Sequence, residues 1–327
     1  MGQKAFLRMS LFLLFTDKKS NSFQFSEINM EDRMFIPGSE WVYLKLYTGT
    51  KTADAILKNE LNGYVKEMLH YSMIDKWFFI RYSDPDFHIR LRLHLKETRN
   101  FGVIFSRFYE IFNPIVNTGF VWNIQCDTYQ REMERYGANT ISIVEDLFFI
   151  DSEYIIRLLQ LHGDNNSEQQ RWKSALVLID SLLCAFSYKL PQRKYLLNTL
   201  AENFKKEFGF TQHHVTKQLN DKYRAFRKDI ENTMLWENEA TEIIEVVNVR
   251  RQAILPIAGK LIDLDAAGEL QVSLNALLTS MIHMTMNRWF RTKNRLHEMV
   301  IYEFLSRYYT SEIAKGIPNR VRNDVER

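Results

Sequence analysis

The amino-acid sequence predicts an α+β fold, with a ferredoxin-like, split βαβ antiparallel sheet in the N-terminal half and a mostly α-helical C-terminal half. Two observations predict it. Up to Gly137, the patterns indicate strand, helix, strand, strand, helix and strand, which is the split βαβ order. From Ala138 onward helical patterns follow one another, and the chain has only 12 Gly and 6 Pro residues, which favours long helices.

The 327 residues divide into three parts. Residues 1–34 are interpreted as an N-terminal extension or linker, residues 35–315 as the folded domain, and residues 316–327 as a tail. Within the domain, residues 35–137 carry the sheet and residues 138–315 the helices. The formal charge of +3 arises from acids and bases that are interspersed, so composition gives no sign of nucleic-acid binding.

The first residues do not have the pattern of a signal peptide. Charged Asp17-Lys18-Lys19 follows the short apolar run at residues 9–15, where cleavage needs small residues, so we interpret the run as a strand or docking segment. No uncharged apolar stretch is long enough to span a membrane. Cys126 and Cys184 lack metal or redox spacing, and we expect reduced thiols in a cytoplasmic protein.

Aromatic and β-branched residues predict the strands, and apolar periodicity predicts the helices. In the first half, strands are expected at residues 41–47, 77–81, 88–95 and 120–128. Helices are expected from Thr50 or Thr52 to about Tyr71 and from Asn100 to about Phe112, where Pro114 ends the helix or its last turn. In the second half, helices are expected at residues 139–149, 151–161, 167–188, 191–208, 211–235, 240–262, 270–290 and 293–313.

The strand at residues 88–95 has the most informative pattern. Its polar residues alternate strictly with aliphatic ones, so one face is aliphatic and the other carries His88, Arg90, Arg92 and His94. Two neighbouring guanidinium groups could bind carboxylates or a phosphate bidentately. A solvated outer face with ordinary surface ion pairs is the alternative, and the pattern leaves both open. The two histidines lie near strand ends, which are expected to be exposed.

Other candidate residues lie where elements end. Arg81 and Tyr82 lie where the first hairpin strand gives way to the turn at residues 83–86. Arg135 precedes a turn at Gly137, whereas Glu132 and Glu134 are expected to pair with neighbouring bases.

His283 lies in an apolar helix, with Asn287 one turn later. A buried structural histidine is the alternative to a proton-transfer role there. The sequence has no glycine-rich phosphate loop, nucleophile elbow or metal-ligand spacing, so no cofactor and no metal are expected.

Four motifs together resemble one family. They are PGSEWVYLKLY at residues 37–47, FIRYSDPDFHIRLRL at 79–93, YQREMERYG at 129–137 and HMTMNR at 283–288. They resemble the C-terminal, glutamate-eliminating domain of LanB-type lantibiotic dehydratases, which also occurs as a stand-alone thiopeptide-type bacteriocin biosynthesis protein. The resemblance spans about residues 35–315. Thr285 departs from it, because many members have a second histidine there, as does the single Gly137, where a pair is common.

The resemblance implies a reaction in two parts. In that family a glutamylation domain uses glutamyl-tRNA to esterify Ser and Thr of a precursor peptide. The elimination domain then expels glutamate and leaves dehydroalanine or dehydrobutyrine. Such an elimination needs a base for the Cα proton and cations for the developing negative charge, and arginine cannot be the base because it stays protonated.

The resemblance also implies roles for individual residues. By motif matching, the family's functional side chains fall on Arg90, Arg92, Arg135 and His283. We expect His283 to handle protons, Arg90 and Arg92 to bind the glutamyl carboxylates, and Arg135 to stabilise the leaving group or the enolate. The arginines of the strand should lie near His283, despite the sequence between them. The substrate-binding residues are expected to include Arg81, Tyr82, His88 and Asn287.

The expected partners are a glutamylated precursor peptide and a separate glutamylation protein, because these residues hold no glutamylation domain and Met1 favours a split enzyme. Direct nucleic-acid binding is not expected, and homo-oligomer formation is left open. Two alternatives remain. One is a pyridine-forming cycloaddition enzyme of thiopeptide pathways, a relative that generally lacks the full elimination set. The other is a non-catalytic scaffold that binds the precursor peptide, for instance at a sheet edge.

Overall fold

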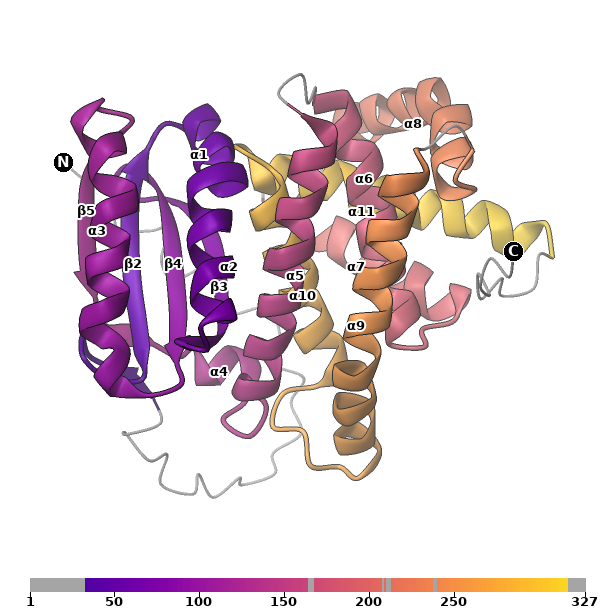
Figure 1. Cartoon of the computed structure of the whole chain (residues 1–327). Coiled ribbons are helices and arrows are strands. Elements are labelled where there is room, and N and C mark those ends of the chain that lie inside the picture. Colours follow the sequence, from indigo (N-terminus) through magenta and orange to yellow (C-terminus); the bar gives the residue numbers. More distant parts are fainter. Residues whose placement is uncertain (1–32, 164–167, 208, 210–212, 238–239, 317–327) are drawn as a thin grey trace.

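Four strands of the N-terminal half form one antiparallel sheet in the computed structural model (Figure 1). They are β2 (Trp41–Thr48), β3 (Ile74–Ser83), β4 (Phe87–Leu95) and β5 (Val121–Asp127), in the spatial order β3, β4, β2, β5. This order confirms the split βαβ prediction. The structure describes residues 33–163, 168–207, 209, 213–237 and 240–316, so the expectations for the run at residues 9–15 and for the tail after residue 316 lie outside it.

The helices that connect the strands cover the aliphatic face of the sheet (Figure 1). α1 (Thr50–Ile56) continues through a π-helical segment (Leu57–Leu61) into α2 (Asn62–His70), and α3 (Phe101–Asn117) follows β4. Buried aliphatic side chains of β2 and β4 belong to one core with residues of these helices. α3 runs past Pro114 to Asn117, further than predicted, because proline keeps a helical φ and removes only one backbone hydrogen bond.

The helical half begins with α4 (Met133–Tyr136), a short helix after the two-stranded ribbon of β1 (Met34–Phe35) and β6 (Tyr129–Gln130). The longer helices that follow in the described residues are α5 (Ile141–His162), α6 (Glu168–Ala185), α7 (Leu190–Glu207), α8 (His213–Met234), α9 (Thr241–Ala266), α10 (Leu274–Trp289) and α11 (Asn294–Ala314). The predicted α+β fold class is therefore confirmed.

One predicted boundary in this half is wrong. Residues 139–149 and 151–161 were expected as two helices, with Asp151 starting the second, but they form the single helix α5. Asp151 is not a cap. Its carboxylate is fully buried in the middle of α5 and accepts from Arg250 Nη2 over 2.7 Å and from Arg288 Nη1 over 3.0 Å.

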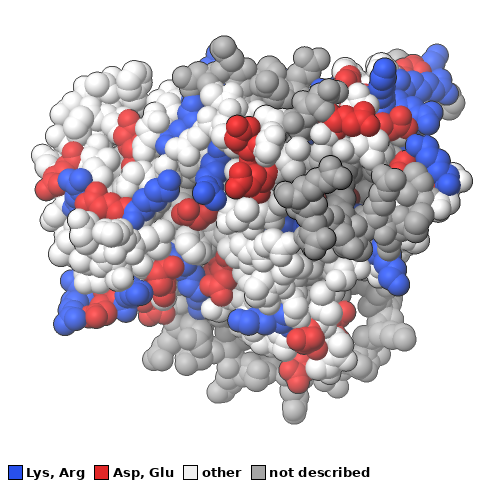
Figure 2. Space-filling view, turned by 45° about the vertical axis from the view of Figure 1, so that its right-hand side comes forward, with Lys and Arg blue, Asp and Glu red and all other residues white. Residues whose placement is uncertain are grey.

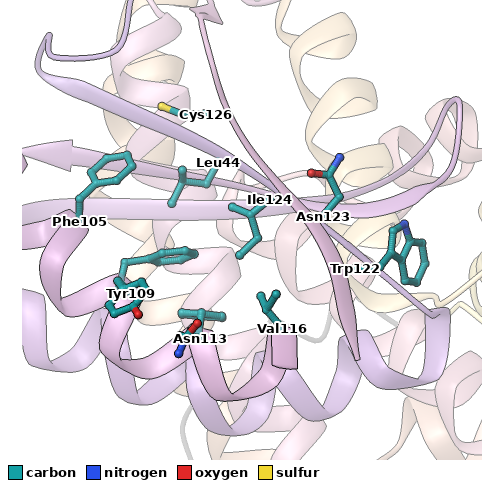
Figure 3. Close-up of a pocket in the computed structure, with 11 residues that line it drawn as sticks. Leu44, Phe105, Tyr109, Asn113, Val116, Trp122, Asn123, Ile124 and Cys126 are labelled. Carbon is teal, nitrogen blue, oxygen red and sulfur yellow. The ribbon is translucent and has the colours of Figure 1, made fainter. Parts of the chain in front are cut away.

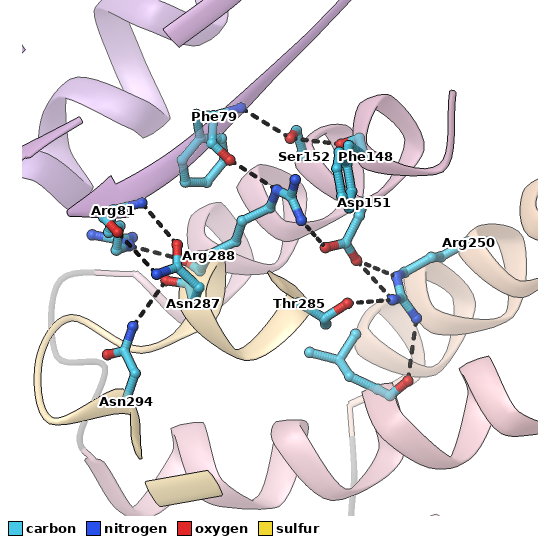
Figure 4. Close-up of polar contacts among 11 residues, drawn as sticks. Phe79, Arg81, Phe148, Asp151, Ser152, Arg250, Thr285, Asn287, Arg288 and Asn294 are labelled. Carbon is cyan, nitrogen blue, oxygen red and sulfur yellow. Dashed lines mark hydrogen bonds and ion pairs between the residues drawn. The ribbon is translucent and has the colours of Figure 1, made fainter. Parts of the chain in front are cut away.

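The outer edge of β3 is covered by side chains of the helical half (Figure 4). The Phe79 N–H donates to Ser152 Oγ over 3.2 Å, and the Phe79 carbonyl accepts from Arg288 Nε over 2.8 Å. Asn287 bonds the backbone of Arg81 twice, accepting from its N–H and donating to its carbonyl, each over 2.9 Å. A strand edge is normally an open template for pairing, and these bonds close it. They also attach α5 and α10 to the sheet.

A second buried carboxylate joins α1 to the helical half. Asp54 accepts from Arg81 Nη2 over 2.6 Å and from Arg291 Nε over 2.5 Å, and it is also bound by Arg171. Burial acts to raise the pKa of Asp54, but the three arginines outweigh it and hold that pKa below its usual value. Buried arginines in this protein are therefore generally paired with aspartate.

The surface carries charges of both signs. On the face in Figure 2, Lys and Arg side chains alternate with Asp and Glu, which agrees with the interspersed charges of the sequence. None of the helices in the described part of the chain is both long and apolar enough to cross a membrane. The two cysteines, Cys126 on β5 and Cys184 on α6, do not form a disulfide.

Candidate functional site

The second face of the sheet carries arginines among aromatic rings, and we call it the cationic face. On β4, Arg90 and Arg92 lie on it. The strand β2 places Lys45 beside Arg90 and Tyr43 beside Arg92, while β3 places Phe78 on the other side of Arg92. The predicted alternation is confirmed. The face is nevertheless no solvated outer surface, because Arg92 is only 8% exposed.

Arg92 is the buried arginine with no carboxylate partner among the described residues. Its guanidinium carbon lies 4.5, 5.2 and 4.8 Å from the ring centroids of Tyr43, Phe78 and Tyr129, and its Nε has no hydrogen-bond partner in that part of the chain. The aromatic faces stabilise the cation in part. A desolvated charge without a counter-ion is still costly, so this position favours binding of an anion.

Arg90 is held beside it by a tyrosine and a histidine. Its guanidinium carbon lies 3.4 Å from the ring centroid of Tyr82, and its Nε donates to His88 Nε2 over 3.0 Å. The other ring nitrogen of His88 donates to the carbonyl of Asp86 over 2.8 Å. Burial lowers the pKa of His88, which keeps the ring neutral so that Nε2 can accept.

The expectation that His88 is exposed at a strand end is wrong. The residue is fully buried, because the rings of Tyr47 and Tyr82 lie against it with centroids 4.7 and 5.6 Å away. His94, at the other end of the strand, is half-buried and bonds Asp75 over 2.7 Å. Of the two histidines, only His88 contacts the arginines that carry the site.

Arg135 enters from α4, which ends at Gly137 with a φ of +78°, a conformation that favours glycine. Its Nε donates to Ser280 Oγ on α10 over 3.1 Å, and its Nη1 lies 3.4 Å from Glu132. Glu132 thus pairs locally as predicted. Glu134 pairs instead with Arg33, over 2.6 Å.

His283 lies on α10, one turn after Ser280. Its Nδ1 lies 2.9 and 3.0 Å from the two carboxylate oxygens of Glu298 on α11, which is fully buried. The Tyr302 hydroxyl also donates to Glu298, over 3.1 Å. Burial raises the pKa of Tyr302 well above its usual range, so the phenol remains a donor. Because a carboxylate only accepts, Nδ1 carries the proton and Nε2 is left as the basic atom of the ring.

Arg135 links the cationic face to the histidine. Burial raises the pKa of Tyr136 to about 12, while the positive charges of Arg135 and Arg92 act to lower it. Both cations therefore act on the same phenol. Burial acts to lower the pKa of Arg135, but Tyr136, Glu132 and Glu298 favour the charged form and raise it. Arg92 and Arg135 therefore both act on Tyr136, and Arg135 bonds Ser280, one helical turn before His283 on α10.

Two predicted binding residues lie elsewhere. The guanidinium of Arg81 points to the aliphatic side of the sheet, where it bonds Asp54 and donates through Nε to the Arg288 carbonyl over 2.9 Å. The amide of Asn287 is occupied by the backbone of Arg81. Tyr82 and His88, by contrast, lie beside Arg90.

Sequence reasoning missed Glu298, Tyr302 and Ser280. Glu298 and Tyr302 are spaced by one helical turn in α11, a signal that also fits many surface pairs, so only the burial of Glu298 distinguishes it. In the described residues, no group of three or more His, Cys, Asp or Glu side chains is arranged to hold a metal ion.

Comparison with known proteins gives a consistent result. The sequence model of the lantibiotic biosynthesis dehydratase C-terminal family matches residues 41–309. The chain is similar to the nisin biosynthesis protein NisB of Lactococcus lactis subsp. lactis, with 29% identity over 292 residues that cover 87% of this chain and 27% of NisB. It is also 23% identical to the subtilin biosynthesis protein SpaB of Bacillus subtilis, over 83% of this chain and 25% of SpaB. The chain spans about a quarter of the length of these curated relatives.

Solved structures show the same fold. The tRNA-dependent lantibiotic dehydratase MibB from Microbispora superposes with a TM-score of 0.68 and 16% identity, over 92% of this chain and 29% of MibB. The pyridine synthase TbtD from thiomuracin biosynthesis superposes with a TM-score of 0.63 and 11% identity, over 85% of this chain and all of TbtD. Since the family match includes the sheet, α4 and α10, the chain belongs to the lantibiotic biosynthesis dehydratase C-terminal family.

Proposed function

We propose that this chain removes glutamate from glutamylated Ser and Thr side chains of a precursor peptide and leaves dehydroalanine or dehydrobutyrine. The observation that carries the proposal is the Arg92 guanidinium, which is buried among three rings without a carboxylate partner in the described chain. Membership of the dehydratase C-terminal family supports a role in dehydration.

The chemistry assigns a task to each side chain. The Cα–H and Cβ–O bonds of the glutamylated residue break, a carbon–carbon double bond forms, and glutamate leaves as a carboxylate. Nε2 of His283 accepts the proton, while Glu298 stabilises the imidazolium that forms. Arg92 and Arg90 bind the free carboxylate of the glutamyl group. Arg135, which bonds Ser280 one helical turn before His283, stabilises negative charge on the enolate or the departing carboxylate.

The substrate of this reaction is a glutamyl ester, which another activity must form. MibB, in which the matching region is 29% of the chain, is described as tRNA-dependent. We infer that a separate glutamylation protein using glutamyl-tRNA supplies the substrate of this chain, and that elimination itself needs no cofactor.

A second candidate is pyridine formation by cycloaddition, because the whole of TbtD superposes on this chain. Elimination of glutamate needs a base for the Cα proton and a cation for the carboxylates. The His283–Glu298 pair, and the lack of a carboxylate partner for Arg92 in the described part of the chain, favour elimination.

The test uses a synthetic peptide that carries one O-glutamyl-serine. With the purified protein, mass spectrometry should show loss of glutamate and a dehydroalanine product. The His283→Gln variant should be at least ~100-fold slower, whereas His70→Gln, on the exposed end of α2, should match the unaltered protein. Equal rates for His283→Gln would remove the histidine from the mechanism, and binding without any mass change would favour the scaffold alternative.

A further inference from the structure

The two edges of the sheet differ in what covers them. The edge at β3 is closed by Ser152, Asn287 and Arg288, as described above. The strand β5 lies at the other edge (Figure 1) and pairs only with β2 among the described strands. Most of its residues are exposed. Natural edges are usually protected by charge or proline, but Val121 to Cys126 contains neither. Within the residues that the structure describes, β5 is therefore an open edge able to accept another strand.

The alternation of the sheet shows which backbone groups are free. On β3, Phe79 and Arg81 point their backbone groups outward. Ile80, between them, therefore bonds β4, and the same alternation continues through β4 and β2 to β5. On β5, Gln125 bonds β2, so the N–H and C=O groups of its neighbours Ile124 and Cys126 point away from the sheet. Their side chains lie on the same side of the sheet as α3.

An uncharged groove lies next to these two residues. Its volume is about 590 Å³, and Figure 3 shows it between α3, with Phe105, Tyr109 and Val116, and the β5 residues Ile124 and Cys126. No lining residue is charged. Trp122 at its end is 54% exposed, and neighbouring Phe120 is 59% exposed. The groove therefore fits aliphatic or aromatic side chains that project from a strand paired with β5.

We propose that this edge is a docking site for the peptide substrate, which adds as an extra strand to β5 and places every second side chain in the groove. The inference rests on the proposed function for the identity of the peptide. The mode of binding is the addition of a strand to an open sheet edge, in which backbone bonds give affinity and alternate pockets give selectivity.

The edge and the reactive site belong to the same sheet, and one row of residues connects them. Asp127 of β5 lies beside Tyr43 of β2, which lies beside Arg92 of β4. With about 4.8 Å between strands, a peptide strand on β5 would lie roughly 14 Å from the Arg92 backbone, a distance that about five extended residues span. A peptide docked on the edge can thus present a modified side chain at the cationic face.

Substrate is favoured over other occupants because β5 is bonded into the cationic face. Gln125 accepts from Tyr47, whose ring lies against His88, and Asp127 forms an ion pair with Lys45 beside Arg90. Docking at β5 is therefore continuous with the site that the peptide must reach. A second copy of the chain would gain no access to that site.

The test measures docking separately from elimination. The probe is a fluorescein-labelled synthetic peptide with an uncharged stretch of alternating Val and Thr, about as long as β5, and no glutamyl group. Its binding is followed by fluorescence anisotropy. Cys126→Pro should weaken binding at least ~10-fold, because proline removes an outward N–H without breaking a bond to β2. Cys126→Val keeps that N–H and should bind as the unaltered protein does.

Peptides N-methylated at alternate positions make the test sharper. Methylation of the residues whose N–H groups face β5 should abolish binding, while methylation of the intervening residues should leave it unchanged, since only one set pairs with the edge. A longer substrate joins the same Val–Thr stretch to the N-terminal or the C-terminal side of O-glutamyl-serine. Compared with a short O-glutamyl-serine peptide, this substrate should have a lower KM and the same kcat.

Three outcomes would overturn the docking proposal. The first is equal affinity of the protein for the two methylated peptides. The second is equal affinity of Cys126→Pro and Cys126→Val for the probe. The third is a dimer that the Cys126→Pro substitution dissociates, which would assign the edge to a second copy of the chain. If the probe docks as expected but no glutamyl peptide reacts, the docking site stands and the proposed elimination fails.

Discussion

Arg92 and Arg250 are both buried, and they differ in what faces them. Arg250 bonds Asp151 through Nε and Nη2, whereas Arg92 faces three aromatic rings. The difference separates a structural arginine from one whose counter-ion is expected to be the substrate. Functional sites commonly retain such unfavourable arrangements because they serve binding.

Substituting the two arginines by methionine should give opposite results. Arg92→Met should leave the free energy of unfolding unchanged or raise it by about 1 kcal/mol, since an uncompensated buried charge is removed. It should also lower kcat/KM for elimination at least ~100-fold. Arg250→Met should lower the free energy of unfolding by about 3 kcal/mol, because Asp151 loses a partner. Urea denaturation checks both, and a clear loss of stability in Arg92→Met would contradict this assignment.

Glu298 is the residue that should tune His283. In Glu298→Gln the negative charge that would stabilise an imidazolium on His283 is lost. The proton on Nδ1 is also no longer specified, because an amide can donate as well as accept. We expect kcat to fall ~10–100-fold with little change in KM. Glu298→Asp keeps the charge and should recover part of the rate. An unchanged kcat in the glutamine variant would show that Glu298 only supports packing.

These residue-scale features were only partly predictable. The alternation in β4 placed Arg90 and Arg92 on one face, because a strand has a period of two residues. It could not show whether water or aromatic rings cover that face, since the rings of Tyr43 and Tyr129 come from other segments. The partnership of His283 with Glu298 depends on how α10 packs against α11, which no local pattern contains.

At the scale of elements, the contact between α10 and β3 positions the site. Asn287 and Arg288 bond the strand edge, and His283 precedes Asn287 by about one helical turn. The sequence predicted α10 within a few residues from its apolar periodicity. It also suggested Asn287 as a substrate ligand, whereas the amide has a backbone partner on β3.

The Asn287→Ala variant tests this contact. Loss of both bonds leaves the N–H and C=O of Arg81 unpaired, so the free energy of unfolding should fall by about 1–3 kcal/mol. Hydrogen exchange of the Arg81 amide should become faster, and elimination should slow because His283 is less firmly placed. The substitution Asn294→Ala, at the start of α11, serves as a control, since among the described residues the Asn294 side chain hydrogen-bonds the Asn287 carbonyl alone, over 3.4 Å. Unchanged exchange at Arg81 would show that the edge is held by other bonds.

For the whole molecule, burial of neutral histidines predicts acid sensitivity. Burial, together with the charge of Arg171, lowers the pKa of His162 to about 4, and burial also lowers that of His88. The unfolded chain therefore binds more protons than the folded one below the ordinary histidine pKa of about 6.5. Stability should be fully present above that pH and should decline as the pH falls towards 4.

His162 alone should account for about 1–2 kcal/mol of this loss, allowing for its partial exposure. The measurement is urea denaturation at a series of pH values. In His162→Gln, the decline between pH 6.5 and 4 should be smaller by that amount. A decline of equal size in both proteins would place the acid sensitivity at other groups.

The bonds between Asn287, Arg288 and the edge of β3 also bear on how such proteins can be recombined. A chimera could take the sheet from one family member and the helices from another. It would then lose the hydrogen bonds between the backbone of β3 and the helix side chains that fit it. The reacting groups would then be misplaced even if both halves folded. We therefore expect β3 and α10 to be transferable between relatives only as one inherited unit.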